Sequence, residues 1–152
     1  MVLNKEYKIY LLDEDVFYMN IFQQQLVNLG YTDITTFHDA AKCLENLNPP
    51  PDIIFYDDGI DYVKGLEVLK MIKRHNPDIF MIYICGQDDV DTVIQSLKYG
   101  VFDYFVKGED DLRNIELVLT KITRVKDLLQ KNSIVRFKNF DTINAGKYTS
   151  NN

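Results

Sequence analysis

Five short hydrophobic runs alternate along the chain with segments whose apolar residues recur every three or four positions. Three of the runs are almost continuously hydrophobic, which is typical of strands covered on both faces of a sheet. The segments between them have the spacing of helices with one buried face. The runs are Tyr7–Leu12, Ile34–Phe37, Ile53–Tyr56, Ile79–Ile84 and Val101–Val106.

The helical segments differ in how clearly the sequence ends them. The first has a stripe from Tyr18 to Leu29, and Gly30 follows as a terminator. The last is the longest and runs from Leu112 to Leu129, after which the stripe fades into polar residues. We therefore predict one domain over residues 1–131 and a polar tail or linker of low order over residues 132–152.

Strand followed by helix, repeated five times, predicts an α/β fold with a doubly wound, five-stranded parallel sheet. Sheets of this class bind ligands beyond the carboxyl ends of their strands, at the point where the strand order reverses. With the strand order 2-1-3-4-5, this point lies between the first and third strands. The residues that follow the strands are therefore the candidates for function.

Charged residues gather at these predicted strand ends. Clustered carboxylates repel each other and need a cation, and an oxygen-only site suits Mg²⁺ or Mn²⁺. A lysine suits phosphoryl oxygens, and a carboxylate can act as a nucleophile, so the set favours phosphoryl transfer. The residues are Asp13, Glu14 and Asp15 after the first run, Asp57, Asp58 and Gly59 after the third, Cys85 after the fourth, and Lys107 with Gly108 after the fifth.

Each of these features has an ordinary structural explanation when it is taken alone. Three acids after a strand often cap a helix, and Asp-Asp-Gly is a common turn. A single lysine before a glycine indicates almost nothing. The functional interpretation depends on all of them standing at strand ends of one repeated pattern.

Over about residues 6–130, the motifs resemble the receiver domain of response regulators. IYLLDED is similar to the family's first strand with its acidic pair, PDIIFYDD to its third strand, and YFVK to its fifth. The stretch KGLEVLKMIK also resembles the family's Gly-Leu-Glu helix start. The resemblance implies the flavodoxin-like (βα)₅ fold with strand order 2-1-3-4-5.

The resemblance also implies roles for individual residues. Asp57 would be the phosphoacceptor, and Mg²⁺ would be held by Asp57, Asp13, Glu14 and the backbone carbonyl of Gly59. Lys107 would balance the phosphoryl charge, Cys85 would take the usual Ser or Thr position, and Tyr104 would be the aromatic switch residue. The donor would be a phosphohistidine on a sensor kinase or phosphotransfer protein, and turnover would be limited to phosphorylation and dephosphorylation of the domain itself.

Three positions depart from the family's pattern. Cys85 replaces the usual hydroxyl residue, and a thiol is the weaker hydrogen-bond donor. Gly108 replaces the usual proline after the lysine, which predicts a trans peptide bond and a differently shaped loop. The loop after Asp57 lacks the usual Met-Pro and carries Lys64.

The net charge and the composition limit the classes of binding partner and the cellular location that we expect for the protein. The net charge is −6, and the segment from Asn132 onward holds three basic residues and one acid, so residues 1–131 carry −6 − 2 = −8. An acidic domain repels nucleic-acid phosphates, so we expect no direct nucleic-acid binding. The sequence has no run long enough to span a membrane. The isolated Cys43 and Cys85 fit free thiols in a reducing cytoplasm.

Four further possibilities remain open at this point. A phosphorylation-independent interaction module would explain Cys85 and Gly108. A flavodoxin-like cofactor binder is disfavoured because DEDVFYMN would repel a flavin phosphate, and the domain is small for an aspartate-nucleophile phosphohydrolase. A homodimer could use the face formed by the fourth helix, fifth strand and fifth helix, around Tyr99, Phe102 and Tyr104. We assign no catalytic role to His38 or His75.

Overall fold

Over the residues that it describes, the computed structural model shows ten helices and strands in strict alternation. It describes residues 5–57, 62–86, 90–108 and 110–149, with the backbone alone for residues 62–64 and 133–149. The elements are β1 (Ile9–Leu12), α1 (Val16–Asn28), β2 (Ile34–Phe37), α2 (Ala40–Glu45), β3 (Ile53–Asp57), α3 (Tyr62–His75), β4 (Phe80–Cys85), α4 (Val90–Lys98), β5 (Asp103–Val106) and α5 (Asp111–Thr149).

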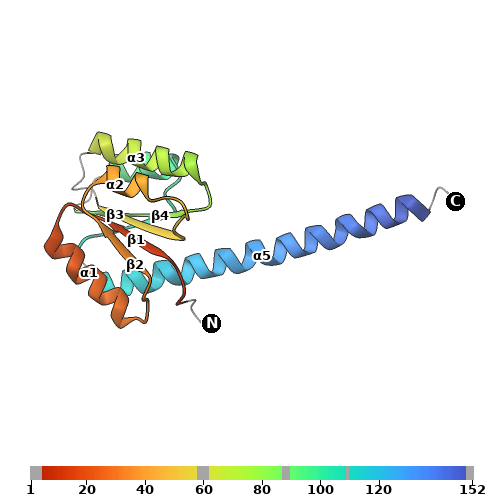
Figure 1. Cartoon of the computed structure of the whole chain (residues 1–152), viewed down its shortest axis with the longest axis horizontal. Coiled ribbons are helices and arrows are strands. Elements are labelled where there is room, and N and C mark those ends of the chain that lie inside the picture. Colours follow the sequence, from red (N-terminus) through yellow and green to blue (C-terminus); the bar gives the residue numbers. More distant parts are fainter. Residues whose placement is uncertain (1–4, 58–61, 87–89, 109, 150–152) are drawn as a thin grey trace. The chain divides into compact units, whose positions relative to one another are not determined.

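The five strands form one parallel sheet in the order β2-β1-β3-β4-β5, and this confirms the predicted fold class (Figure 1). Ile9 of β1 lies opposite Ile34 of β2 and Ile53 of β3. The two strands flanking the switch point, β1 and β3, are buried along their whole length. Continuous burial explains why these runs are hydrophobic at every position rather than at alternate ones.

Helices cover both faces of the sheet, with α2 and α3 on one side and α1 on the other (Figure 1). On the first side, Tyr56 of β3 joins a buried cluster that includes Cys43 of α2 and Leu69 of α3. On the second side, Phe22 of α1 packs 5.1 Å from Phe55 and 6.1 Å from Phe105, measured between ring centroids. The core is thus split into two layers by the sheet, as doubly wound folds require.

The strand bounds differ from the predicted ones by a few residues. β3 and β4 each continue one residue further, so that Asp57 and Cys85 are the last residues of their strands. β5 begins at Asp103, although Val101 is buried. Two of the proposed functional residues therefore have their backbone fixed by the sheet itself.

The C-terminal segment is where the sequence prediction was wrong. Residues 132–149, expected to have low order, continue α5 as helix to Thr149. The chain has no proline after Pro77, so nothing in this stretch interrupts the helical hydrogen bonds. The contacts divide the chain into two compact units, Met1–Val118 and Leu119–Asn152, and the domain boundary after residue 131 remains a prediction.

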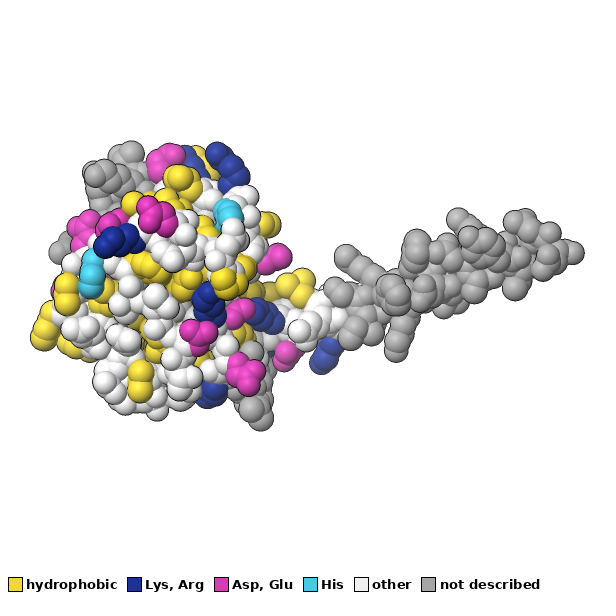
Figure 2. Space-filling model, viewed as in Figure 1, with side chains coloured by type: hydrophobic (Ala, Val, Ile, Leu, Met, Phe, Trp, Pro, Cys, Tyr) yellow, Lys and Arg dark blue, Asp and Glu magenta, His cyan; other side chains and the backbone are white. Residues whose placement is uncertain are grey.

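The surface of the first unit carries mixed charge. Acidic side chains lie among lysines and arginines on the face shown in Figure 2. Within the part of the chain that the structure describes, no helix combines the length and the hydrophobicity needed to cross a membrane.

Candidate functional site

Three carboxylates surround one lysine at the carboxyl ends of the strands. Asp13 follows β1 and Asp57 ends β3, and their exposed fractions are 5% and 2%. The Lys107 Nζ atom lies 2.8 Å from Asp57 Oδ2, 3.7 Å from Asp13 Oδ2 and 3.9 Å from Asp15 Oδ2. The structure thus brings the residues predicted after three different strands to the switch point of the sheet.

Backbone hydrogen bonds hold these residues where the strands end. The Asp13 N–H donates to the Phe37 carbonyl at 3.1 Å, and the Lys107 N–H donates to the Cys85 carbonyl at 2.7 Å. The Asp13 carboxylate accepts the Asp15 N–H at 2.8 Å, and Asp15 in turn caps α1. Asp15 therefore has both the capping role expected of such acids and a place beside Lys107.

The electrostatics of the site favour a further positive charge. Burial raises the pKa of Asp13 from 3.8 to about 6, and the charge of Asp57 adds to this, while the Asp15 N–H and Lys107 oppose it. Burial alone would lower the pKa of Lys107, but the hydrogen bond and the charge of Asp57 raise it. One ammonium thus faces three acids, and a divalent cation would relieve the remaining repulsion.

The predicted magnesium ligands are only partly described. The Glu14 side chain is exposed, and Gly59 lies outside the described residues. Among residues 5–57, 62–86, 90–108 and 110–149, no three Asp, Glu, His or Cys side chains are grouped to hold a metal ion. The buried Asp13 and Asp57 still fit Mg²⁺, which typically binds one or two carboxylates and keeps several waters.

Cys85 lies beside the site and contacts β5. Its side chain is buried within the hydrophobic cluster on the α2 and α3 face of the sheet. The Sγ atom donates to the Phe105 carbonyl at 3.5 Å. The thiol therefore contacts the backbone of the residue that follows Tyr104.

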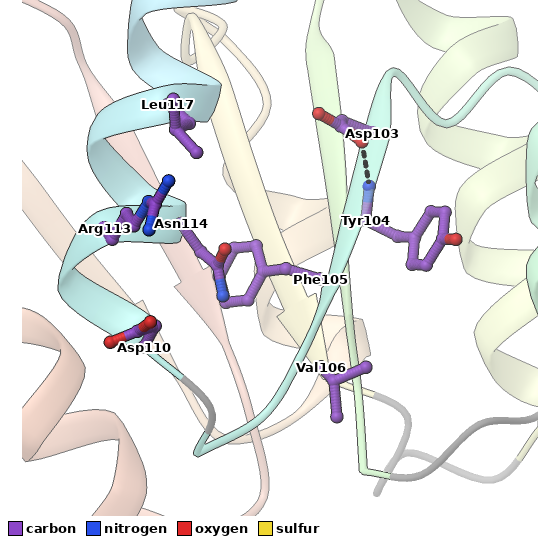
Figure 3. Close-up of a pocket in the computed structure, with 8 residues that line it drawn as sticks. All are labelled: Asp103, Tyr104, Phe105, Val106, Asp110, Arg113, Asn114 and Leu117. Atoms are coloured by element: carbon purple, nitrogen blue, oxygen red, sulfur yellow. Dashed lines mark hydrogen bonds between the residues drawn. The ribbon is translucent and has the colours of Figure 1, made fainter.

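Tyr104 lies on the edge strand, with 41% of its surface exposed. Figure 3 shows its ring pointing away from α5, whereas Phe105 points toward it. The Asp103 carboxylate accepts the Tyr104 N–H at 2.8 Å (Figure 3). An open groove of about 570 Å³ runs along this strand and is lined by Asp103, Tyr104, Phe105, Val106, Asp110, Arg113, Asn114 and Leu117.

Two residues near Lys107 have contacts that the sequence analysis did not predict. The Lys107 Nζ atom lies 4.0 Å from the centroid of the Tyr18 ring. The Tyr18 hydroxyl donates to Asp111 Oδ2 at 3.0 Å. Tyr18 was assigned only to the buried stripe of the first helix, but its place one turn after three acids could have indicated a position at the strand ends.

The loop after Lys107 has the predicted trans peptide bond to Gly108. Gly108 has a φ of +86°, a conformation that favours glycine. The Gly108 N–H donates to Asp111 Oδ1 at 2.9 Å. The loop shape is therefore set by the glycine and by the first residue of α5.

Comparison with known proteins gives a consistent result. The profile of the family described as response regulator receiver domain matches residues 9–119. The DNA-binding transcriptional regulator NtrC of Escherichia coli (strain K12) is 28% identical over 127 residues, which are 83% of this chain and 27% of that protein. The chain thus spans about a quarter of the length of the curated relatives it matches.

Solved structures agree with the fold. The CheY-like receiver domain protein of Methanospirillum hungatei JF-1 has a TM-score of 0.72 at 19% identity, covering 80% of this chain and 98% of that one. NtrX of Brucella abortus, in complex with ADP, has a TM-score of 0.75 at 24% identity, covering 86% of this chain and 29% of that one.

Proposed function

Because the chain belongs to the response regulator receiver domain family of two-component signalling, we propose that it is a switch phosphorylated on Asp57. The observation that carries this proposal is the buried Asp57 carboxylate, 2.8 Å from the Lys107 ammonium and close to Asp13. A carboxylate at the end of a rigid strand is a positioned nucleophile, and the lysine supplies a fixed positive charge beside it.

In the proposed reaction, an oxygen of Asp57 attacks the phosphorus of a phosphohistidine on a partner kinase or phosphotransfer protein. The new O–P bond forms as the N–P bond breaks, and the imidazole nitrogen leaves with the bonding electrons and takes up a proton. Asp13 and Asp57, with Glu14 and the Gly59 carbonyl, would hold Mg²⁺, which neutralises phosphoryl charge when bound. Lys107 orients and neutralises the phosphoryl oxygens that remain.

The proposed response to phosphorylation is a conformational change at the ends of β4 and β5. Cys85 ends β4, and its contact with the Phe105 carbonyl offers a route from the phosphoryl group to Tyr104. Rotation of the exposed Tyr104 ring would then bias two pre-existing conformations. Residues 87–89, between β4 and α4, lie outside the described residues.

The exposed apolar side chains and the charge of the surface indicate which partners the domain could bind. Exposed apolar side chains on α4 and β5, such as Ile94, Leu97 and Tyr104, support a homodimer through the α4–β5–α5 face. The acidic residues 1–131 would not bind nucleic acid themselves, although the relatives are named as DNA-binding regulators. A phosphohistidine donor and free thiols at Cys43 and Cys85 are consistent with a cytoplasmic location.

The direct test is the intact mass of the protein after incubation with Mg²⁺ and acetyl phosphate. We expect one phosphoryl adduct on the parent chain and on Asp58→Asn, which removes the next carboxylate in the sequence. We expect none on Asp57→Asn or in EDTA. Absence of the adduct from a folded parent chain that binds Mg²⁺ would instead favour a phosphorylation-independent interaction module.

Replacing Cys85 by threonine should strengthen the response without changing the chemistry. A hydroxyl donates a better hydrogen bond than a thiol, and a difference of about 0.5–1 kcal/mol would shift the switch equilibrium about two- to fivefold. The measurement is the change in the NMR signals of Tyr104 on phosphorylation, with Cys43→Ala as a buried-thiol control. An equal response in Cys85→Thr and the parent would count against a role for position 85.

A further inference from the structure

The Lys107 side chain is held by an aromatic ring as well as by carboxylates. Tyr18 comes from the first turn of α1, and its ring centroid lies 4.0 Å from the Lys107 ammonium. A cation over a tyrosine face is attracted by the ring. The ring is itself fixed, because it lies 6.0 Å from the Phe22 ring and its backbone N–H donates to Asp15 at 3.1 Å.

One carboxylate joins this tyrosine to the loop that carries the lysine. Asp111 Oδ2 accepts the Tyr18 hydroxyl at 3.0 Å, and Asp111 Oδ1 accepts the Gly108 N–H at 2.9 Å. Burial and the adjacent Asp111 charge raise the pKa of Tyr18, so its hydroxyl remains a donor. The contacts form a closed path from α1 to Asp111, then to Gly108 and Lys107.

The loop after Lys107 needs the hydrogen bonds to Asp111 because the glycine at position 108 leaves its own backbone free to adopt several conformations. Gly108 has a φ of +86°, and a Cβ atom built on it would meet nothing within 4 Å. A side chain at position 108 would therefore have enough space, and it is the positive φ angle that favours glycine there. A proline, usual in the family at this position, would restrict the loop by itself, whereas this chain needs contacts from outside the loop.

We propose that Tyr18 and Asp111 are positioning residues for Lys107: Tyr18 packs its ring on the ammonium, and Asp111 ties both Tyr18 and Gly108 in place. Lys107 is thereby kept at the Asp57 carboxylate despite the glycine that follows it. The consequence for reaction rate rests on the proposed phosphorylation of Asp57, whereas the placement itself does not.

The placement is tested on the unphosphorylated, metal-free protein by NMR. The Tyr18 ring should move the side-chain proton signals of Lys107 upfield in the parent, less in Tyr18→Phe, whose ring is no longer held by Asp111, and not at all in Tyr18→Leu. The Gly108 amide should exchange slowly in the parent and fast in Asp111→Ala. Unshifted Lys107 signals in the parent, or a Gly108 amide unaffected by Asp111→Ala, would overturn the proposal even if Asp57 proved not to be phosphorylated.

The effect on rate is tested with acetyl phosphate at fixed Mg²⁺. We expect Tyr18→Phe and Asp111→Ala to slow phosphorylation by roughly three- to tenfold, because misplaced groups lose much of their effect. The double variant should be no slower than Asp111→Ala, since both act through one connection. Tyr18→Phe should have no further effect when Lys107 is already methionine.

A matched control separates this role from general packing. Tyr10 is buried, whereas Tyr18 is half-buried, and the Tyr10 hydroxyl donates to the Asn46 carbonyl away from the site. Tyr10→Phe should leave the phosphorylation rate and the Lys107 signals unchanged. A rate loss in Tyr18→Phe that persists in the Lys107→Met background would show that Tyr18 acts by another route and would overturn the proposal.

Discussion

Replacing Lys107 by methionine is expected to slow phosphorylation of Asp57 by about a hundredfold to a thousandfold, the usual effect of removing one preorganised charge-stabilising group. Methionine has a similar length but no charge. The ammonium lies 2.8 Å from Asp57, whose side chain is almost entirely excluded from solvent. Few water molecules can therefore reach the site to stabilise the phosphoryl charge in place of the ammonium. The rate of phosphorylation is measured from the intact mass of samples quenched at different times.

Lys70→Met is the matched control for this variant. The Lys70 Nζ atom also pairs with a carboxylate, at 3.1 Å from Glu67, and lies 4.2 Å from the centroid of the Tyr99 ring. Lys70 therefore has the same two kinds of partner as Lys107, but Glu67 is exposed and Lys70 lies on α3, so we expect its variant to react at the parent rate. Equal rates in the parent and Lys107→Met would contradict the role proposed for the lysine.

Asp13→Asn is expected to make the metal-free protein more stable by about 1–3 kcal/mol at neutral pH, because one pKa unit corresponds to about 1.4 kcal/mol. Burial raises the pKa of Asp13 from 3.8 to about 6, so its charged form disfavours the folded state. Asparagine removes the charge and keeps an oxygen that can accept the Asp15 N–H. The measurement is urea unfolding in EDTA.

The pH dependence of this difference has a defined sign. The folded-state pKa of Asp13 lies above the unfolded value, so its protonated form stabilises the fold below about pH 4. This contribution is lost as the pH rises through about 6, and the advantage of Asp13→Asn should appear over the same range. Asp33→Asn, which replaces an exposed acid, is the control and should change the stability little. Added Mg²⁺ should stabilise the parent more than Asp13→Asn, and equal stabilisation would argue against Asp13 as a ligand.

The fold could be predicted almost completely from hydrophobic patterning. β1 and β3 are buried on both faces, so the residues of β1, and those of β3 before Asp57, are all apolar or aromatic and stand out from the helical segments. The end of α5 could not be predicted in this way, because residues 132–149 lack a continuous apolar stripe and yet contain no proline, although Gly146 weakens the helix. A stripe indicates which helix faces are buried, and its absence does not mark the end of a helix.

Residues of the site could be predicted from the sequence only where they lie directly at the end of a strand. Asp13, Asp57 and Lys107 were identified because parallel strands place their following residues at one edge. Tyr18 was not, because an aromatic residue in an apolar stripe is usually part of the core. Asp111 was not identified, because it lies just before the predicted Leu112–Leu129 stripe and its two hydrogen bonds depend on the tertiary structure.

The hydrogen bond from the Tyr104 amide to Asp103 affects how the sheet can grow. Lys107, three residues further along, donates its N–H to β4, so the alternation of the strand turns the Tyr104 N–H toward the free edge. The Asp103 carboxylate already occupies this donor, at 2.8 Å. A strand from another molecule would have to displace that bond and bury a negative charge, which opposes fibril-like stacking through β5. Association on this side of the domain, including the proposed homodimer, is then expected to use side chains, and crowded molecules should not join into one continuous sheet.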